Sequence, residues 1–120
     1  MKKAGTQRVL EYLDHIRQAI QRITRYTSGL DQTTFLANEE KQDAVIRNFE
    51  IIGEASRNIE RHHPDFATAH PDVPWGVAVE MRNALAHGYF KVDMEIVWKT
   101  IHHDLPDLEQ KISQLLRQLE

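Results

Sequence analysis

The sequence predicts an all-α protein, a four- to five-helix bundle that forms a single domain over residues 1–120. Apolar residues recur at alternating spacings of three and four along most of the chain, which is the pattern of one buried helix face. No stretch of useful length alternates apolar and polar residues as a half-buried strand would. Hydrophobic residues make up 41% of the 120 residues, so one core can form without disulfides.

The first helix is expected over residues 7–26, with Thr6 as its N-cap and Gly29 as its stop. Its apolar stripe keeps the helical spacing throughout and consists of Val9, Leu13, Ile16, Ile20 and Ile23. The connector that follows carries Phe35 and Leu36, and both are expected to pack back onto the core.

A second helix is expected to begin after Asn38, with the stripe Val45, Phe49, Ile52, Ala55 and Ile59. The segment 64–74 ends this helix and is predicted to be a loop, because it contains three prolines and proline removes a donor from a helix interior. Residues 72–75 then open a third helix, which is expected to end near Ala86 because Gly88 weakens it just beyond.

Two more helices complete the predicted bundle. Asp93 is expected to cap a fourth helix, whose apolar residues are Ile96, Val97, Trp98 and Ile101. Pro106 is expected to break or kink the path, and a last amphipathic helix follows with the stripe Leu108, Ile112, Leu115 and Leu119. The two tryptophans, Trp75 and Trp98, are expected to anchor the core.

The composition excludes several classes of function. Because there is no cysteine, disulfides, thiolate chemistry and cysteine-ligated zinc are ruled out. The first residues lack the apolar stretch of a signal peptide, and no run approaches the ~18 apolar residues of a membrane span, so a cytoplasmic protein is expected. The net charge of −3 does not suit a protein that coats nucleic acid. RNA binding would need a local basic cluster, for which the chain offers Arg47, Arg57, Arg61 and Lys91, unless these simply form a solvated face.

One short segment concentrates side chains that can carry out chemistry: Arg82, Asn83, His87 and Tyr89. On an ideal helix Arg82 and His87 would point about 140° apart, so they can converge only if the helix unwinds near Gly88. The alternative is an ordinary helix end, at which Arg82 pairs with a carboxylate and His87 caps the last carbonyl groups.

This segment resembles the R-x4-H-x-Y signature of the HepT-like HEPN ribonuclease toxins. The resemblance extends in order over roughly residues 8 to 116, through blocks at 12–16, 42–48 with 51–55, 71–75, 92–93 and 96–98. It implies a HEPN-type helical bundle with a metal-independent endoribonuclease site formed by Arg82 and His87, and with Asn83 positioning or binding the substrate. Cleavage is expected to leave a 2′,3′-cyclic phosphate and a 5′-hydroxyl.

The resemblance also implies partners. The active unit is expected to be a homodimer with a composite site, and a cognate minimal nucleotidyltransferase antitoxin of MntA type is expected to attach AMP to Tyr89 and silence the RNase. Glu54, in the Gly-Glu-Ala turn of the second helix, is either a buried carboxylate that orients Arg82 or an ordinary exposed helix glutamate.

No metal and no cofactor are expected. The histidine pairs His62-His63 and His102-His103 are poor chelators, because neighbours on a helix point about 100° apart. They are more simply explained as solvated helix-end residues. Two other functions stay open: a catalytically idle HEPN module that binds nucleotide, RNA or its partner as a regulatory subunit, and a plain helical dimerisation protein.

Overall fold

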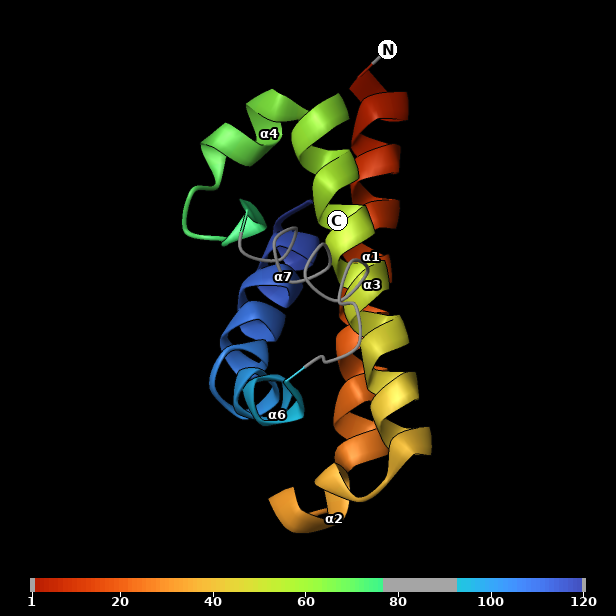
Figure 1. The fold of residues 1–120 in the computed structure, drawn as a ribbon. Coiled ribbons are helices and arrows are strands. Elements are labelled where there is room, and N and C mark those ends of the chain that lie inside the picture. Colours follow the sequence, from red (N-terminus) through yellow and green to blue (C-terminus); the bar gives the residue numbers. More distant parts are fainter. Residues whose placement is uncertain (1, 77–92, 120) are drawn as a thin grey trace.

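In a computed structural model, which describes residues 2–76 and 93–119, the protein is built from helices (Figure 1). No strand occurs in this part of the chain. The helices are α1 (Lys2–Thr27), α2 (Gln32–Leu36), α3 (Glu39–His62), α4 (Pro64–Ala69), α6 (Met94–His103) and α7 (Leu105–Leu119). The all-α prediction is therefore confirmed, although the described helices already outnumber the four or five expected. Among the described residues, no helix is both long and apolar enough to cross a membrane.

The two longest helices, α1 and α3, lie antiparallel side by side, as the red-to-orange and yellow-to-green ribbons of Figure 1 show. The predicted stripes form their contact, and every member is buried: Val9, Leu13, Ile16, Ile20 and Ile23 on α1, and Val45, Phe49, Ile52, Ala55 and Ile59 on α3. Burying one such aliphatic side chain contributes about 1.5–3 kcal/mol. This helix pair therefore supplies a large part of the core.

The C-terminal helices complete the core. Helix α7 packs on α1, α6 packs on α7, and the short α2 bridges α3 and α6. Helix α7 begins at Leu105 and not after Pro106, because a proline in the first turn removes no hydrogen bond that the helix would otherwise make. The predicted break therefore falls between α6 and α7, at Asp104, two residues before Pro106.

The helix ends follow the chemistry of their capping residues. Gly29 has a φ of 79° and ends the turn after α1. Asp93 accepts from the backbone N–H groups of Glu95 and Ile96 at 3.0 and 3.3 Å, so the predicted cap is confirmed. Helix α3 begins directly after Asn38 as predicted, and the Asn38 side chain caps it by accepting from the Lys41 backbone N–H at 3.0 Å. The cap predicted at Thr6 is wrong, because α1 already begins at Lys2.

Helix α2 was not expected. Its N-cap is Asp31, whose carboxylate accepts from the Thr34 backbone N–H at 2.8 Å. This hydrogen bond lowers the pKa of the Asp31 carboxyl below its ordinary value. Within α2, Phe35 is fully buried as predicted, but Leu36 remains 37% exposed, so the prediction that both pack onto the core is wrong for Leu36.

The loop predicted over residues 64–74 is partly wrong. Pro64 occupies the first turn of α4, where proline is tolerated, and only the rest of the segment, from His70 onward, is non-helical. Residues 75 and 76 are helical, which agrees with a third helix opening there, but its course to Ala86 lies outside the described residues. Trp75 is buried, and its indole N–H donates to the His70 carbonyl at 3.1 Å.

The second tryptophan lies in the middle of a short row of aromatic rings. Trp98 is half-buried, with its ring 5.2 Å from that of Phe35 and 4.2 Å from that of His102. Val97 and Ile101 of α6 are buried as expected, whereas Ile96 is 54% exposed and does not belong to the core. The row joins α2 to α6, so Phe35 holds two elements together.

We expect Phe35→Ala to lower the free energy of unfolding by about 3–5 kcal/mol, because it removes a fully buried ring and leaves a cavity. Leu36→Ala is the matched control, since this neighbour is 37% exposed and its loss should change stability much less, by about 1 kcal/mol. Urea denaturation followed by circular dichroism measures both. Equal losses in the two variants would contradict this packing of α2.

Candidate functional site

The motif residues predicted to do the chemistry lie outside the described part of the chain. This applies to Arg82, Asn83, His87 and Tyr89, and to the basic residue Lys91. Their roles therefore stay predictions. Glu54 is the one predicted site residue that the structure describes.

Glu54 lies on α3 and is exposed, so the expectation that its carboxylate is buried is wrong, while its expected role in orienting Arg82 stays a prediction. The buried stripe of α3 includes Ile52 and Ala55. Glu54 directly precedes Ala55, so its side chain points about 100° away from that of Ala55. The side chain of Glu54 is thereby directed off the core. It contributes to the wall of a pocket on this surface.

The pocket has a volume of about 480 Å³ and lies between α1 and α3. Its described lining consists of two residues of α1 and six of α3: Tyr12, His15, Arg47, Glu50, Ile51, Glu54, Ala55 and Asn58. The residues from α3 recur at spacings of three and four, so they share one helix face. The antiparallel pairing of the two helices therefore brings residues that are far apart in the sequence to one surface.

The pocket combines an apolar floor with a charged rim. Ala55 is buried, and Ile51 is half-buried against the core. Tyr12 is half-buried, and its ring lies 6.2 Å from that of His63. The polar groups of the described lining are the guanidinium of Arg47, the carboxylates of Glu50 and Glu54, the imidazole of His15 and the amide of Asn58. Such a site offers both donors and acceptors to a ligand.

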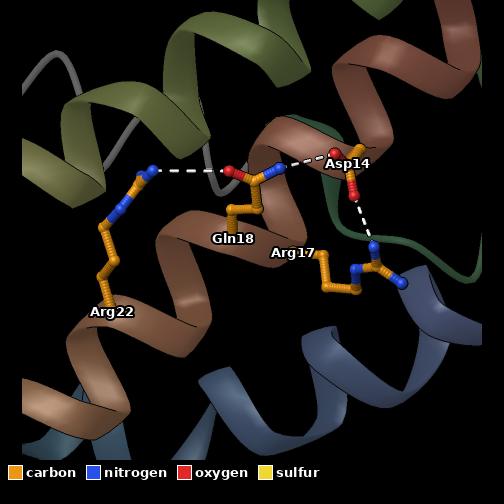
Figure 2. Close-up of polar contacts among 4 residues, drawn as sticks. All are labelled: Asp14, Arg17, Gln18 and Arg22. Atoms are coloured by element: carbon orange, nitrogen blue, oxygen red, sulfur yellow. Dashed lines mark hydrogen bonds and ion pairs between the residues drawn. The ribbon is translucent and has the colours of Figure 1, made fainter.

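A polar contact ties α1 to α3 beside the buried stripes. Asn48 is buried, its amide donates to the Ala44 carbonyl at 2.8 Å, and its Oδ1 accepts from Arg22 Nη1 at 3.4 Å. Figure 2 shows how Arg22 is held on α1: its Nη2 lies 3.4 Å from Gln18 Oε1, and Gln18 Nε2 donates to Asp14 at 2.6 Å.

Asp14 also accepts from Arg17, so hydrogen bonds connect four side chains along α1, from Arg22 to Arg17 (Figure 2). The hydrogen bond from Arg22 to Asn48 joins the two helices in the alignment that the buried stripes set. That alignment in turn places Tyr12 and His15 beside the pocket face of α3.

The remaining candidates are placed as follows. Arg47, Arg57 and Arg61 are all exposed on α3, but only Arg47 lines the pocket. His62, His102 and His103 are exposed in the last turns of their helices, as expected for solvated helix-end residues. The expectation is wrong for His63, which follows α3 and is half-buried against Tyr12. Among residues 2–76 and 93–119, no group of three or more His, Asp or Glu side chains is arranged to hold a metal ion.

Sequence analysis missed most of the pocket. Glu50 and Asn58 were not singled out, and Tyr12 was noticed only as part of the resemblance. The periodicity of α3 contained a usable pattern, because Arg47, Ile51, Glu54 and Asn58 form a second stripe beside the buried one. Which residues of α1 would face this stripe depends on the register of the helix pair, which periodicity does not give.

Comparison with known proteins gives consistent results. A family model described as "Ribonuclease HepT-like" matches residues 16–115. A protein of Thermococcus cleftensis named as a probable ribonuclease HepT is 43% identical over 88% of this chain and 93% of its own length. A candidate RNase of Caldanaerobacter subterraneus is 34% identical over 88% of this chain and 92% of its own.

A third relative, from Methanocaldococcus jannaschii, is named as a gamma-glutamylcyclotransferase and candidate RNase. It is 36% identical over 91% of this chain, which spans only 48% of that longer protein. No solved structure matches the chain closely enough to be counted as similar.

Proposed function

This chain belongs to the HepT-like ribonuclease family, and on that premise we propose that it is the endoribonuclease toxin of a toxin–antitoxin pair. The observation that carries the proposal is the family match over residues 16–115, which includes the segment with Arg82, His87 and Tyr89. The relatives named as ribonucleases support RNA as the substrate.

In the proposed reaction the RNA supplies its own nucleophile, the 2′-hydroxyl. One imidazole removes the proton of this hydroxyl, O2′ attacks the phosphorus, the P–O5′ bond breaks, and a second acid protonates the departing O5′. His87 suits the proton transfers because an imidazole titrates near neutral pH. Arg82 suits the phosphate because a guanidinium binds two of its oxygens and stays charged. The products are a 2′,3′-cyclic phosphate and a 5′-hydroxyl, with no metal ion required.

Glu54 and Asn83 are assigned supporting roles in this proposal. Glu54 lies on the pocket face of α3, and we assign its carboxylate to orienting Arg82 by pairing with the guanidinium. Asn83 follows Arg82 directly and is assigned to binding the substrate. Both residues act on the position of other groups and transfer no proton.

The active unit in this proposal is a homodimer. One chain offers a single histidine in the motif, whereas the reaction needs one group to remove a proton and another to donate one. A two-fold axis beside the motif brings two copies of His87 and Arg82 into one cleft, as an isologous interface permits.

The proposed partner is a minimal nucleotidyltransferase antitoxin that attaches AMP to Tyr89. The tyrosine oxygen attacks the α-phosphorus of ATP, and pyrophosphate leaves. The adduct places bulk and negative charge where the RNA phosphate must sit, so it competes for Arg82 and repels the substrate.

We expect His87→Ala and Arg82→Ala each to lower RNA cleavage by at least about 100-fold, because each removes a proton-transfer group or the charge that stabilises the transition state. Glu54→Gln should lower it less, because the amide still fits the pocket but attracts the guanidinium more weakly. His103→Ala is the control, since this exposed histidine lies at the end of α6. Cleavage of labelled RNA by purified proteins in EDTA measures all four, and full activity of either motif variant would refute the assignment.

We expect the purified protein to have the mass of a dimer at the concentration used in the assay. Light scattering coupled to gel filtration gives this mass. A fully active monomer would rule out the composite site, because a single motif histidine cannot fill both proton-transfer roles.

Tyr89→Phe is expected to cleave RNA at a near-normal rate and to resist silencing by the partner nucleotidyltransferase with ATP, because it lacks only the acceptor oxygen. Tyr26→Phe is the control and should be silenced like the wild type. Intact-mass spectrometry after co-expression should show added AMP in the wild type and in Tyr26→Phe, and none in Tyr89→Phe. AMP on the Tyr89→Phe variant would exclude this tyrosine as the switch.

A further inference from the structure

The pocket between α1 and α3 is lined by polar side chains that have no role in the proposed cleavage step. Of its described lining, only Glu54 has a role in that step. Its volume of about 480 Å³ lies within the range of small-molecule sites. The remaining side chains therefore suggest a ligand of their own.

The floor of the pocket suits a flat ring. Ala55 is buried, Ile51 is half-buried, and Tyr12 supplies an aromatic face beside them. Proteins that read single-stranded RNA stack splayed bases on such aromatic and apolar surfaces. Tyr12 is held in place by the helix pair and by its ring contact with His63.

The rim of the pocket limits which ring fits. Arg47 carries donors only and Glu50 carries acceptors only, and both line the pocket three residues apart on α3. This spacing separates their backbone positions by about 4.5 Å along the helix axis. Arg47 forms no ion pair with any residue that the structure describes, so its donors stay available to a ligand.

Among the four RNA bases, guanine matches this pair. It offers two acceptors, O6 and N7, for an arginine, and two neighbouring donors, N1–H and N2–H₂, for a carboxylate. The other bases have a single donor group on the corresponding edge. A phosphate group of the RNA fits this pocket less well than a base does, because the Glu50 carboxylate repels it.

We infer that this pocket binds a guanine base of the single-stranded RNA substrate and thereby selects where the strand is cut. The inference rests on the proposed ribonuclease function, which supplies the RNA. In it, Tyr12 stacks on the base, Glu50 accepts from N1–H and N2–H₂, and Arg47 donates to O6 or N7.

Calorimetry with the four nucleoside 5′-monophosphates tests this without any cleavage step. GMP should bind at least about tenfold more tightly than AMP, CMP or UMP, the scale of one bidentate contact. Glu50→Gln should remove this preference, because the amide cannot accept from both guanine donors. Glu60→Gln is the matched control: the same change at an exposed residue of α3 outside the pocket should leave binding unchanged.

The ring contact has its own pair of variants. Tyr12→Phe keeps the aromatic face and should bind GMP as the wild type does, whereas Tyr12→Leu should weaken binding of GMP about tenfold. Circular dichroism confirms that each variant is folded. In RNA, cleavage by the wild type should concentrate next to guanines, and Glu50→Gln should cut without this preference.

Equal affinity for the four nucleotides, or an unchanged preference in Glu50→Gln, would overturn the assignment. So would a change in the mass of Glu50→Gln by light scattering, since the pocket would then belong to a contact between two copies of the chain. RNA cleavage without guanine preference contradicts only the pocket. Guanine preference that depends on Glu50 but occurs without RNA cleavage contradicts only the ribonuclease proposal.

Discussion

The antiparallel packing of α1 against α3 is the constraint on which the rest of the structure depends. The two buried stripes, from Val9 to Ile23 and from Val45 to Ile59, fix which faces meet. The hydrogen bond between Arg22 and Asn48 joins the two helices in this alignment. The same register leaves the neighbouring faces of both helices exposed, and the candidate pocket forms there. The same helix pair thus supplies both the core and the proposed recognition surface.

Sequence periodicity predicted the long elements well because their stability comes from a continuous apolar face. It failed where a short helix depends on a local contact or on tertiary packing. Helix α2 forms around the Asp31 cap and the burial of Phe35, and α4 forms because Pro64 falls in a first turn. The early start of α1 was missed because Thr6 has the chemistry of a cap yet lies inside the helix.

Part of the candidate site could likewise be predicted from the sequence, and part could not. The pair Arg82 and His87 came from an ordered motif, and the family match spans the segment that contains it. The exposure of Glu54 was predictable in principle, since Ile52 and Ala55 already fix the buried face of α3. The pocket was not predictable, because Tyr12 and Glu50 meet only through the register of two helices. In the inferred role of the pocket, the helix pair that stabilises the fold also selects the RNA base.

The central claim is that the chain cleaves RNA by internal transfer to the 2′-hydroxyl, and analysis of the product ends tests it most directly. Purified protein is incubated with a defined oligoribonucleotide in EDTA, and the fragments are identified by mass spectrometry. The account predicts 2′,3′-cyclic phosphate and 5′-hydroxyl ends, and no cleavage of the same strand with 2′-O-methyl groups. Products with 3′-hydroxyl and 5′-phosphate ends, formed only with a divalent metal, would contradict it.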